Sequence, residues 1–119
     1  MTLALVDDDA DVRTALNRLL RSLGHEVRLF ASAEEFEADA AAVDCVILDV
    51  RLPGLNGLEL RERILAAGRI PPIVFITGDG DRFLGDEIPM DMPTLHKPFD
   101  EDALVAAIGA VVAASHRNR

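Results

Sequence analysis

The sequence is poor in aromatic residues and in cysteine, and both shortages limit what its core can be. It contains five phenylalanines, no tryptophan and no tyrosine, although half of its 119 residues are hydrophobic. A core built from this chain must therefore consist mostly of leucine, valine, isoleucine and alanine, and the length suffices for one compact domain. The single cysteine, Cys45, cannot form an internal disulfide, and its apolar surroundings indicate a buried small hydrophobic residue.

Basic clusters and long apolar runs are also missing. The formal net charge is −9, and no stripe of lysine and arginine offsets it. Direct binding to nucleic acid or to an anionic membrane needs such a stripe, so we expect neither; a cation or a basic protein partner is compatible with the charge. The first residues lack the features of a signal peptide, and the longest stretch without polar side chains, 103–114, is too short to span a bilayer. A cytoplasmic location is therefore expected.

Strand-like and helix-like patterns alternate along the chain. Short apolar runs of the kind that form buried strands are each followed by apolar residues at helical spacing. The expected strands are 3–6, 26–30, 44–50, 72–77 and 94–96, and the clearest helices begin near 12, 32, 58 and 100. This alternation predicts an α/β fold, with one parallel sheet covered by helices on both faces, over a single domain 1–119.

One segment, 78–93, breaks the alternation. It contains three glycines and two prolines, which interrupt a regular helix. We expect the fourth helix to be shortened or irregular, with at most a turn or two around 81–87. The last helix begins after this segment, with Asp100 as its expected N-cap.

Polar residues follow the strands at the points where they end. Asp7 and Asp8 follow the first strand, Asp49 ends the third, Thr77 ends the fourth and Lys97 follows the fifth. In a parallel sheet these side chains converge on one edge, where the functional crevice of such folds lies. Three converging carboxylates repel one another unless a cation neutralises them, and Mg²⁺ prefers oxygen ligands. A lysine and a hydroxyl beside the metal could hold a phosphoryl group.

Other sites are disfavoured by what the sequence lacks. No cluster of histidine and cysteine is present, which argues against zinc. Neither GxxxxGK[ST] nor GxGxxG occurs, which argues against a nucleotide cradle. The third acidic residue of the first group, Asp9, precedes a helix and is interpreted as its N-cap.

Four motifs occur in a fixed order at the expected strand ends: VDDD at 6–9, LDVRLPGLNG at 48–57, ITG at 76–78 and HKPF at 96–99. With these motifs the chain resembles the receiver domain of two-component response regulators over essentially its full length. The resemblance implies a flavodoxin-like doubly wound (βα)5 fold with strand order 2-1-3-4-5. It also implies Mg²⁺-dependent transfer of a phosphoryl group from a sensor histidine kinase or a phosphotransfer protein.

The resemblance assigns a role to each acidic residue. Asp49 matches the phospho-acceptor, because it precedes Pro53 and Gly57 at the spacing of the family. Asp8 matches the direct metal ligand, and Asp7 matches the ligand that acts mainly through water. The backbone carbonyl of Arg51 matches the remaining protein ligand.

The resemblance extends to the other end of the site, with one departure. Lys97 is expected to pair with a phosphoryl oxygen, and Thr77 is expected to turn its hydroxyl toward the phosphate. Family members usually carry an aromatic switch residue three positions before the lysine, where this chain has Thr94.

The three histidines are interpreted as ordinary surface or half-buried residues: His25, His96 and His116.

The expected output is contact with another protein. The chain ends at SHRNR, directly after the last helix, so a downstream protein partner is expected, with the domain acting as a phosphate shuttle, a sink or an allosteric regulator. The alanine-rich last helix leaves a homodimer open. The stretch 23–36 is similar to receivers of nitrogen-fixation regulators. The irregular segment 78–93 is instead similar to the corresponding segment of single-domain regulators.

We expect a phospho-acceptor that is not an enzyme and that at most dephosphorylates itself slowly. Two other classes of function compete with this expectation. The first is a Mg²⁺-dependent phosphohydrolase with an aspartyl intermediate, but such enzymes show DxDx[TV] after a strand, and Asp49 is followed by Val-Arg-Leu. The second is a pseudo-receiver that binds partners without being phosphorylated. The complete set of three aspartates, threonine and lysine argues against it.

Overall fold

The computed structural model describes residues 1–39, 42–68, 72–78, 94–97 and 100–117. Within these ranges the elements follow one another as β1 (Thr2–Val6), α1 (Ala10–Ser22), β2 (Glu26–Phe30), α2 (Ala33–Asp39), β3 (Cys45–Asp49), α3 (Gly57–Ala66), β4 (Ile73–Thr77), β5 (Thr94–His96) and α5 (Glu101–Arg117). The strands form one sheet in the order β2-β1-β3-β4-β5, and every pairing is parallel. The α/β fold and the strand order expected from the sequence are confirmed.

The apolar pattern of each strand explains its place in the sheet. The strands β3 and β4 are buried along their whole length, because both of their faces are covered. The strand β2 alternates between exposed and buried residues and lies at one edge of the sheet. Successive side chains of a strand point to opposite faces, so the central strands supply two separate packing layers.

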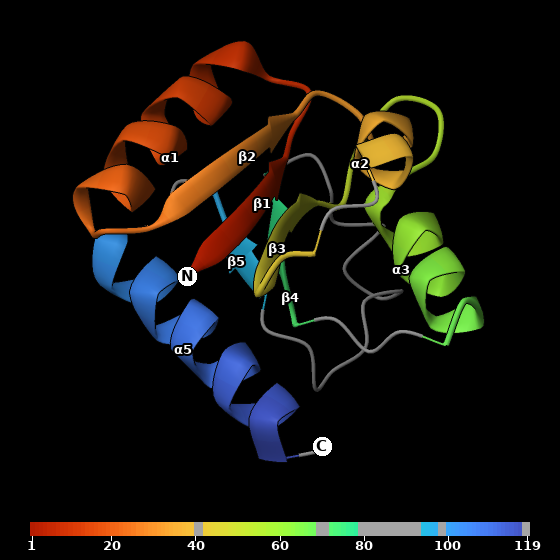
Figure 1. Cartoon of the computed structure of the whole chain (residues 1–119). Coiled ribbons are helices and arrows are strands. Elements are labelled where there is room, and N and C mark those ends of the chain that lie inside the picture. Colours follow the sequence, from red (N-terminus) through yellow and green to blue (C-terminus); the bar gives the residue numbers. More distant parts are fainter. Residues whose placement is uncertain (40–41, 69–71, 79–93, 98–99, 118–119) are drawn as a thin grey trace.

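Helices cover both faces of the sheet (Figure 1). The layer that packs α2 and α3 against the sheet includes Ala33, Val46, Leu48, Leu60, Ile64 and Phe75. The layer that packs α1 and α5 against the other face includes Leu16, Leu20, Ile47, Ile76, Leu104 and Ile108. Both layers consist chiefly of aliphatic side chains, as the composition predicts.

Cys45 belongs to the layer below α1 and α5 and is fully buried. Burial, together with the nearby charge of Asp44, raises the pKa of the Cys45 thiol to about 12. The residue is therefore a neutral hydrophobic part of the core, as the sequence indicates.

Side-chain caps mark where α1, α3 and α5 begin. Asp9 caps α1 by accepting from the backbone of Asp11 at 2.9 Å, and Asp100 accepts from the backbone of Ala103 at 2.7 Å at the start of α5. Both caps agree with the sequence prediction. At α3, Asn56 and Glu59 form a reciprocal capping box.

The irregular fourth helix predicted for the segment after Gly78 lies outside the described residues, since 79–93 are not among them. Among those that are described, no helix has both the length and the apolar character that crossing a membrane requires.

Candidate phosphoryl-accepting site

Each candidate polar residue stands at the carboxyl end of a strand. Asp7 directly follows β1, Asp49 ends β3, Thr77 ends β4 and Lys97 directly follows β5. These four strands are parallel neighbours, so their carboxyl ends meet at one edge of the sheet. Asp8 lies one residue beyond Asp7 in the same loop. The structure thus brings these five residues to the same edge.

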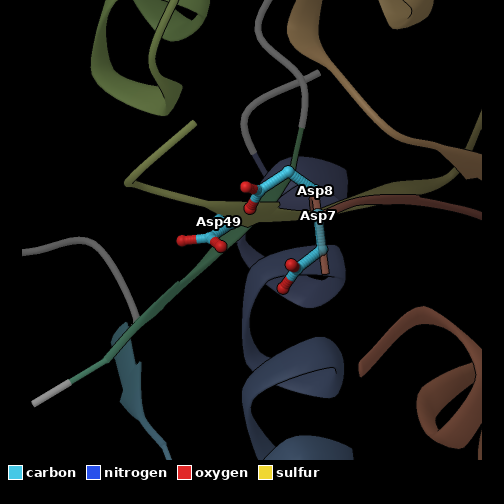
Figure 2. A group of neighbouring side chains, drawn as sticks. All are labelled: Asp7, Asp8 and Asp49. Atoms are coloured by element: carbon cyan, nitrogen blue, oxygen red, sulfur yellow. The ribbon is translucent and has the colours of Figure 1, made fainter. Parts of the chain in front are cut away.

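The three carboxylates gather around a common space, as Figure 2 shows. One oxygen of each of Asp7, Asp8 and Asp49 lies within 4.8 Å of the others. Asp7 is fully buried and Asp49 is 5% exposed, whereas Asp8 is exposed. The sheet therefore fixes two of the carboxylates, and the third has room to adjust.

Lys97 supplies positive charge to the two buried carboxylates. Its Nζ atom donates to Asp7 Oδ2 at 3.0 Å and lies 3.4 Å from Asp49 Oδ2. The remaining oxygens accept from the backbone: Asp7 Oδ1 from the N–H of Asp9 at 2.9 Å, and Asp49 Oδ1 from the N–H of Arg51 at 3.0 Å. Every oxygen of the two buried carboxylates therefore has a donor, which offsets the cost of burying charge.

Burial and these contacts together shift the pKa values of Asp49 and Lys97. Burial is the main reason that the pKa of Asp49 rises from 3.8 to about 6, with the charge of Asp7 adding to it and the Arg51 N–H and Lys97 opposing it. Burial disfavours the charged form of Lys97, but its contacts with Asp7 and Asp49 outweigh this, so its pKa lies above the usual 10.5. Lys97 is therefore an ammonium at neutral pH, while Asp49 is ionised at a cost.

The donor set fits magnesium. In an octahedral Mg²⁺ site adjacent oxygens lie about 3.0 Å apart and opposite ones about 4.2 Å apart. Oxygens within 4.8 Å of one another must therefore move closer together around the ion, and the exposed Asp8 has room to do so. Asp7 already uses both oxygens in hydrogen bonds to the protein, which suits contact through a metal-bound water. Arg51, whose carbonyl completes the expected ligand set, lines the same surface pocket as Asp8 and Asp49.

This pocket is open to solvent and combines acidic, basic and apolar residues. Its lining among the described residues is Asp8, Asp49, Arg51, Leu52, Pro53, Gly78 and Lys97. It places an exposed carboxylate, an almost buried carboxylate and an ammonium around one open space. Such a space can admit an anionic group next to a metal ion.

Gly57 lets the loop after β3 pass close to Asp49. A Cβ atom at Gly57 would lie 2.5 Å from the backbone oxygen of Asp49 and 3.0 Å from the Cα of Val50. The N–H of Gly57 also donates to the carbonyl of Val50 at 3.0 Å. Because both crowded atoms belong to the backbone, no side-chain rotation can make room for a Cβ.

Replacing Gly57 with alanine is therefore expected to destabilise the fold by about 2 kcal/mol, the range of overpacked cores, and to displace Asp49. Urea unfolding monitored by circular dichroism measures the change. The matched control is Gly109→Ala in α5, where a Cβ meets nothing within 4 Å. That change should stabilise the protein by about 0.5 to 1 kcal/mol. Equal stability of the two variants would contradict the proposed steric role.

Thr77 contacts a residue that the sequence analysis treated as an ordinary histidine. Its hydroxyl Oγ1 lies 2.9 Å from Nδ1 of His96, which faces it across the β4–β5 pairing. Thr77 is 1% exposed and His96 is exposed. The contact depends on the register of two strands, so no local pattern in the sequence predicts it.

A second residue missed by the sequence analysis is Arg13 of α1. Its Nη1 atom donates to the backbone carbonyl of Asp7 at 2.7 Å. The first helix is thereby tied to the end of β1, where the acidic pair begins. An arginine seven residues after a strand end is too common a pattern to indicate such a contact by itself.

The fold and the edge residues together define a class: a flavodoxin-like receiver fold with three carboxylates and a lysine at the carboxyl ends of its strands. Comparison with known proteins agrees. A sequence model described as the response regulator receiver domain matches residues 3–109. The chain belongs to this family.

The relatives include regulators of bacterial two-component systems. The response regulator protein TmoT of Ectopseudomonas mendocina is 40% identical over 87% of this chain and 49% of its own length. The transcriptional regulatory protein FixJ of Bradyrhizobium diazoefficiens is 40% identical over 91% of this chain and 55% of its own length. A crystal structure of full-length FixJ from B. japonicum aligns with a TM-score of 0.85 at 39% identity, over 94% of this chain and 57% of that one. The chain spans about half the length of these relatives.

Proposed function

We propose that this receiver domain accepts a phosphoryl group on Asp49, from a sensor histidine kinase or a histidine phosphotransfer protein. The observation that carries the proposal is the placement of Asp49 in a pocket with Asp8 and Lys97, at the carboxyl edge of the sheet. A carboxylate oxygen of Asp49 attacks the phosphorus, the bond from phosphorus to the donor's imidazole nitrogen breaks, and an acyl phosphate forms.

Asp7, Asp8, Asp49 and the carbonyl of Arg51 hold the magnesium ion in this proposal. When bound, Mg²⁺ neutralises the carboxylates and the charge on the phosphoryl oxygens. Asp8, which is exposed, would bind the ion directly, whereas buried Asp7 would act mainly through water because both of its oxygens already accept hydrogen bonds. Burial disfavours the ionised, nucleophilic form of Asp49, and a bound cation would favour it.

Lys97 and Thr77 act on the phosphoryl group itself. Lys97 already lies 3.4 Å from Asp49 Oδ2, and its ammonium pairs with a phosphoryl oxygen once Asp49 is modified. Thr77, on the neighbouring strand β4, turns its hydroxyl toward the phosphate. This couples the chemistry of the pocket to the surface of the domain.

The further assignments concern the domain as a whole. We propose that residues 1–119 form one receiver domain of a cytoplasmic signalling protein, whose output is contact with a downstream protein and not direct binding of nucleic acid. The support is the single sheet with its two core layers and the strongly acidic composition. A homodimer through the alanine-rich α5 is a further arrangement to test by light scattering.

Phosphorylation by a small donor tests the proposed function. Incubation with acetyl phosphate and Mg²⁺ is expected to add one phosphoryl group per chain, measured by intact-protein mass spectrometry, and chelation of the metal should prevent the addition. Sustained turnover of a phosphomonoester would favour the phosphohydrolase. Absence of both labelling and Mg²⁺ binding at millimolar metal would favour the pseudo-receiver.

A further inference from the structure

His96 is joined to the proposed site through Thr77. The two residues face one another in the β4–β5 register, and Thr77 Oγ1 lies 2.9 Å from His96 Nδ1. A backbone hydrogen bond joins β4 and β5 at the same place: the N–H of Lys97, the residue after His96, donates to the carbonyl of Thr77 at 2.7 Å. The imidazole thus has a defined place on the edge strand β5.

The hydroxyl of Thr77 contacts this imidazole, and Thr77 is not among the described residues that line the pocket. Thr77 is 1% exposed, and among the described residues the pocket beside Asp49 is lined at the end of β4 by Gly78 and not by Thr77. In the phosphate-free protein the hydroxyl is therefore held on the β5 side of the strand.

Contact with a phosphoryl group on Asp49 requires the Thr77 side chain to turn. The contact with His96 fixes the position of Oγ1 whichever imidazole nitrogen carries the proton, because the hydroxyl can both donate and accept. A rotation that carries Oγ1 to the pocket therefore breaks this contact. The two partners, imidazole and phosphoryl oxygen, compete for one hydroxyl group.

We propose that His96 is a positioning residue that holds Thr77 in the phosphate-free state and is released when Thr77 engages the phosphoryl group. This rests on the proposed role of Thr77. Because His96 is exposed on the edge strand β5, its release carries the state of Asp49 to the surface.

The spectroscopic test uses the full chain with Mg²⁺ and beryllofluoride, a non-covalent phosphoryl mimic. Long-range ¹H–¹⁵N spectra report the hydrogen bonding of each imidazole nitrogen. The Nδ1 resonance of His96 is expected to move as the mimic binds, with the same midpoint as the amide of Asp49. His25 is the internal control, because its Nδ1 lies 3.5 Å from the N-terminal ammonium and its partner does not change.

A pair of substitutions separates this role from a merely structural one. His96→Asn keeps an acceptor close to the position of Nδ1, whereas His96→Gln places its polar atoms further along the side chain. His96→Gln is expected to bind the mimic about three- to tenfold more tightly than the native chain, since one hydrogen bond no longer competes. His96→Asn should resemble the native chain, as should the control His25→Gln. Mg²⁺ affinity without the mimic should be equal in all of them.

Two results would overturn the role of His96 while leaving the proposed function intact: a stationary His96 resonance during full binding of the mimic at Asp49, or equal mimic affinity of His96→Gln and the native chain. Failure of the native chain both to bind the mimic and to accept a phosphoryl group from acetyl phosphate would overturn the proposed function and this inference together.

Discussion

Asp49→Asn is expected to lower the rate of phosphoryl labelling by acetyl phosphate and Mg²⁺ by at least about a hundredfold. The substitution replaces the proposed nucleophilic oxygen with an amide of the same shape, so the covalent path is lost while the fold is kept. Intact-protein mass spectrometry against time measures the rate. Labelling at full stoichiometry in Asp49→Asn would remove Asp49 as the acceptor.

The same substitution has a predicted effect on stability in metal-free solution. Burial raises the folded-state pKa of Asp49 to about 6, so its favourable contribution is complete below pH 3.8 and is lost as pH rises through about 6. This change corresponds to at most about 3 kcal/mol. At pH 8 without metal, Asp49→Asn should therefore unfold at higher urea than the native chain, and the difference should vanish near pH 4.

The control for both effects is Asp39→Asn. Asp39 is exposed and pairs with Arg28 at 2.9 Å on the surface, where an ion pair contributes about 0 to 1 kcal/mol. It should be labelled like the native chain and show no gain in stability at pH 8. A comparable gain in stability for Asp39→Asn would indicate that the effect of Asp49→Asn comes from a general reduction of negative charge.

Lys97→Met is expected to abolish most of the labelling and to destabilise the metal-free protein by about 2 kcal/mol at pH 8. It leaves Asp7 and Asp49 buried beside one another without their ammonium. Breaking a fully buried pair costs about 3 to 5 kcal/mol, and the value here is lower because the Lys97 side chain is 27% exposed. Urea unfolding and mass spectrometry measure the two effects.

The destabilisation by Lys97→Met depends on pH and metal in a defined direction. Without the ammonium the ionised carboxylates are less favourable, so the folded-state pKa of Asp49, which Lys97 lowers, rises further and stability falls more steeply as pH increases. The loss should shrink at pH 5, and millimolar Mg²⁺ should restore part of it. The surface substitution Arg28→Met serves as the matched control. A loss that is equal at pH 5 and pH 8 and insensitive to Mg²⁺ would argue against the pairing.

The placement of the acidic residues could be predicted from the sequence because it depends on local patterns. Asp49 directly follows four apolar residues and Asp7 directly follows another apolar run. Once alternation with helices implies a parallel sheet, each residue that ends a strand is assigned to the same edge. The strand order needed more than this pattern and came from the resemblance to the receiver family.

The contacts within the site could not be predicted in the same way. The Thr77–His96 contact joins residues 19 positions apart and depends on strand register. Lys97 reaches Asp7 across 90 positions, and only packing shows that its ammonium bridges two carboxylates. The raised pKa of Asp49 depends on burial, which no spacing encodes. By contrast, the capping box of Asn56 and Glu59 has a readable signature and could have been found.

Lys97 is the only lysine in the 119 residues. The one side-chain amine of these residues therefore lies in the pocket with Asp49 and in contact with Asp7, and the only other amine of a protein made with this sequence is the N-terminal one. Reagents specific for amines consequently address this pocket alone among the side chains, with the N-terminus as an internal reference. The protein thus contains its own chemical reporter of whether the carboxylates around Lys97 are free or occupied.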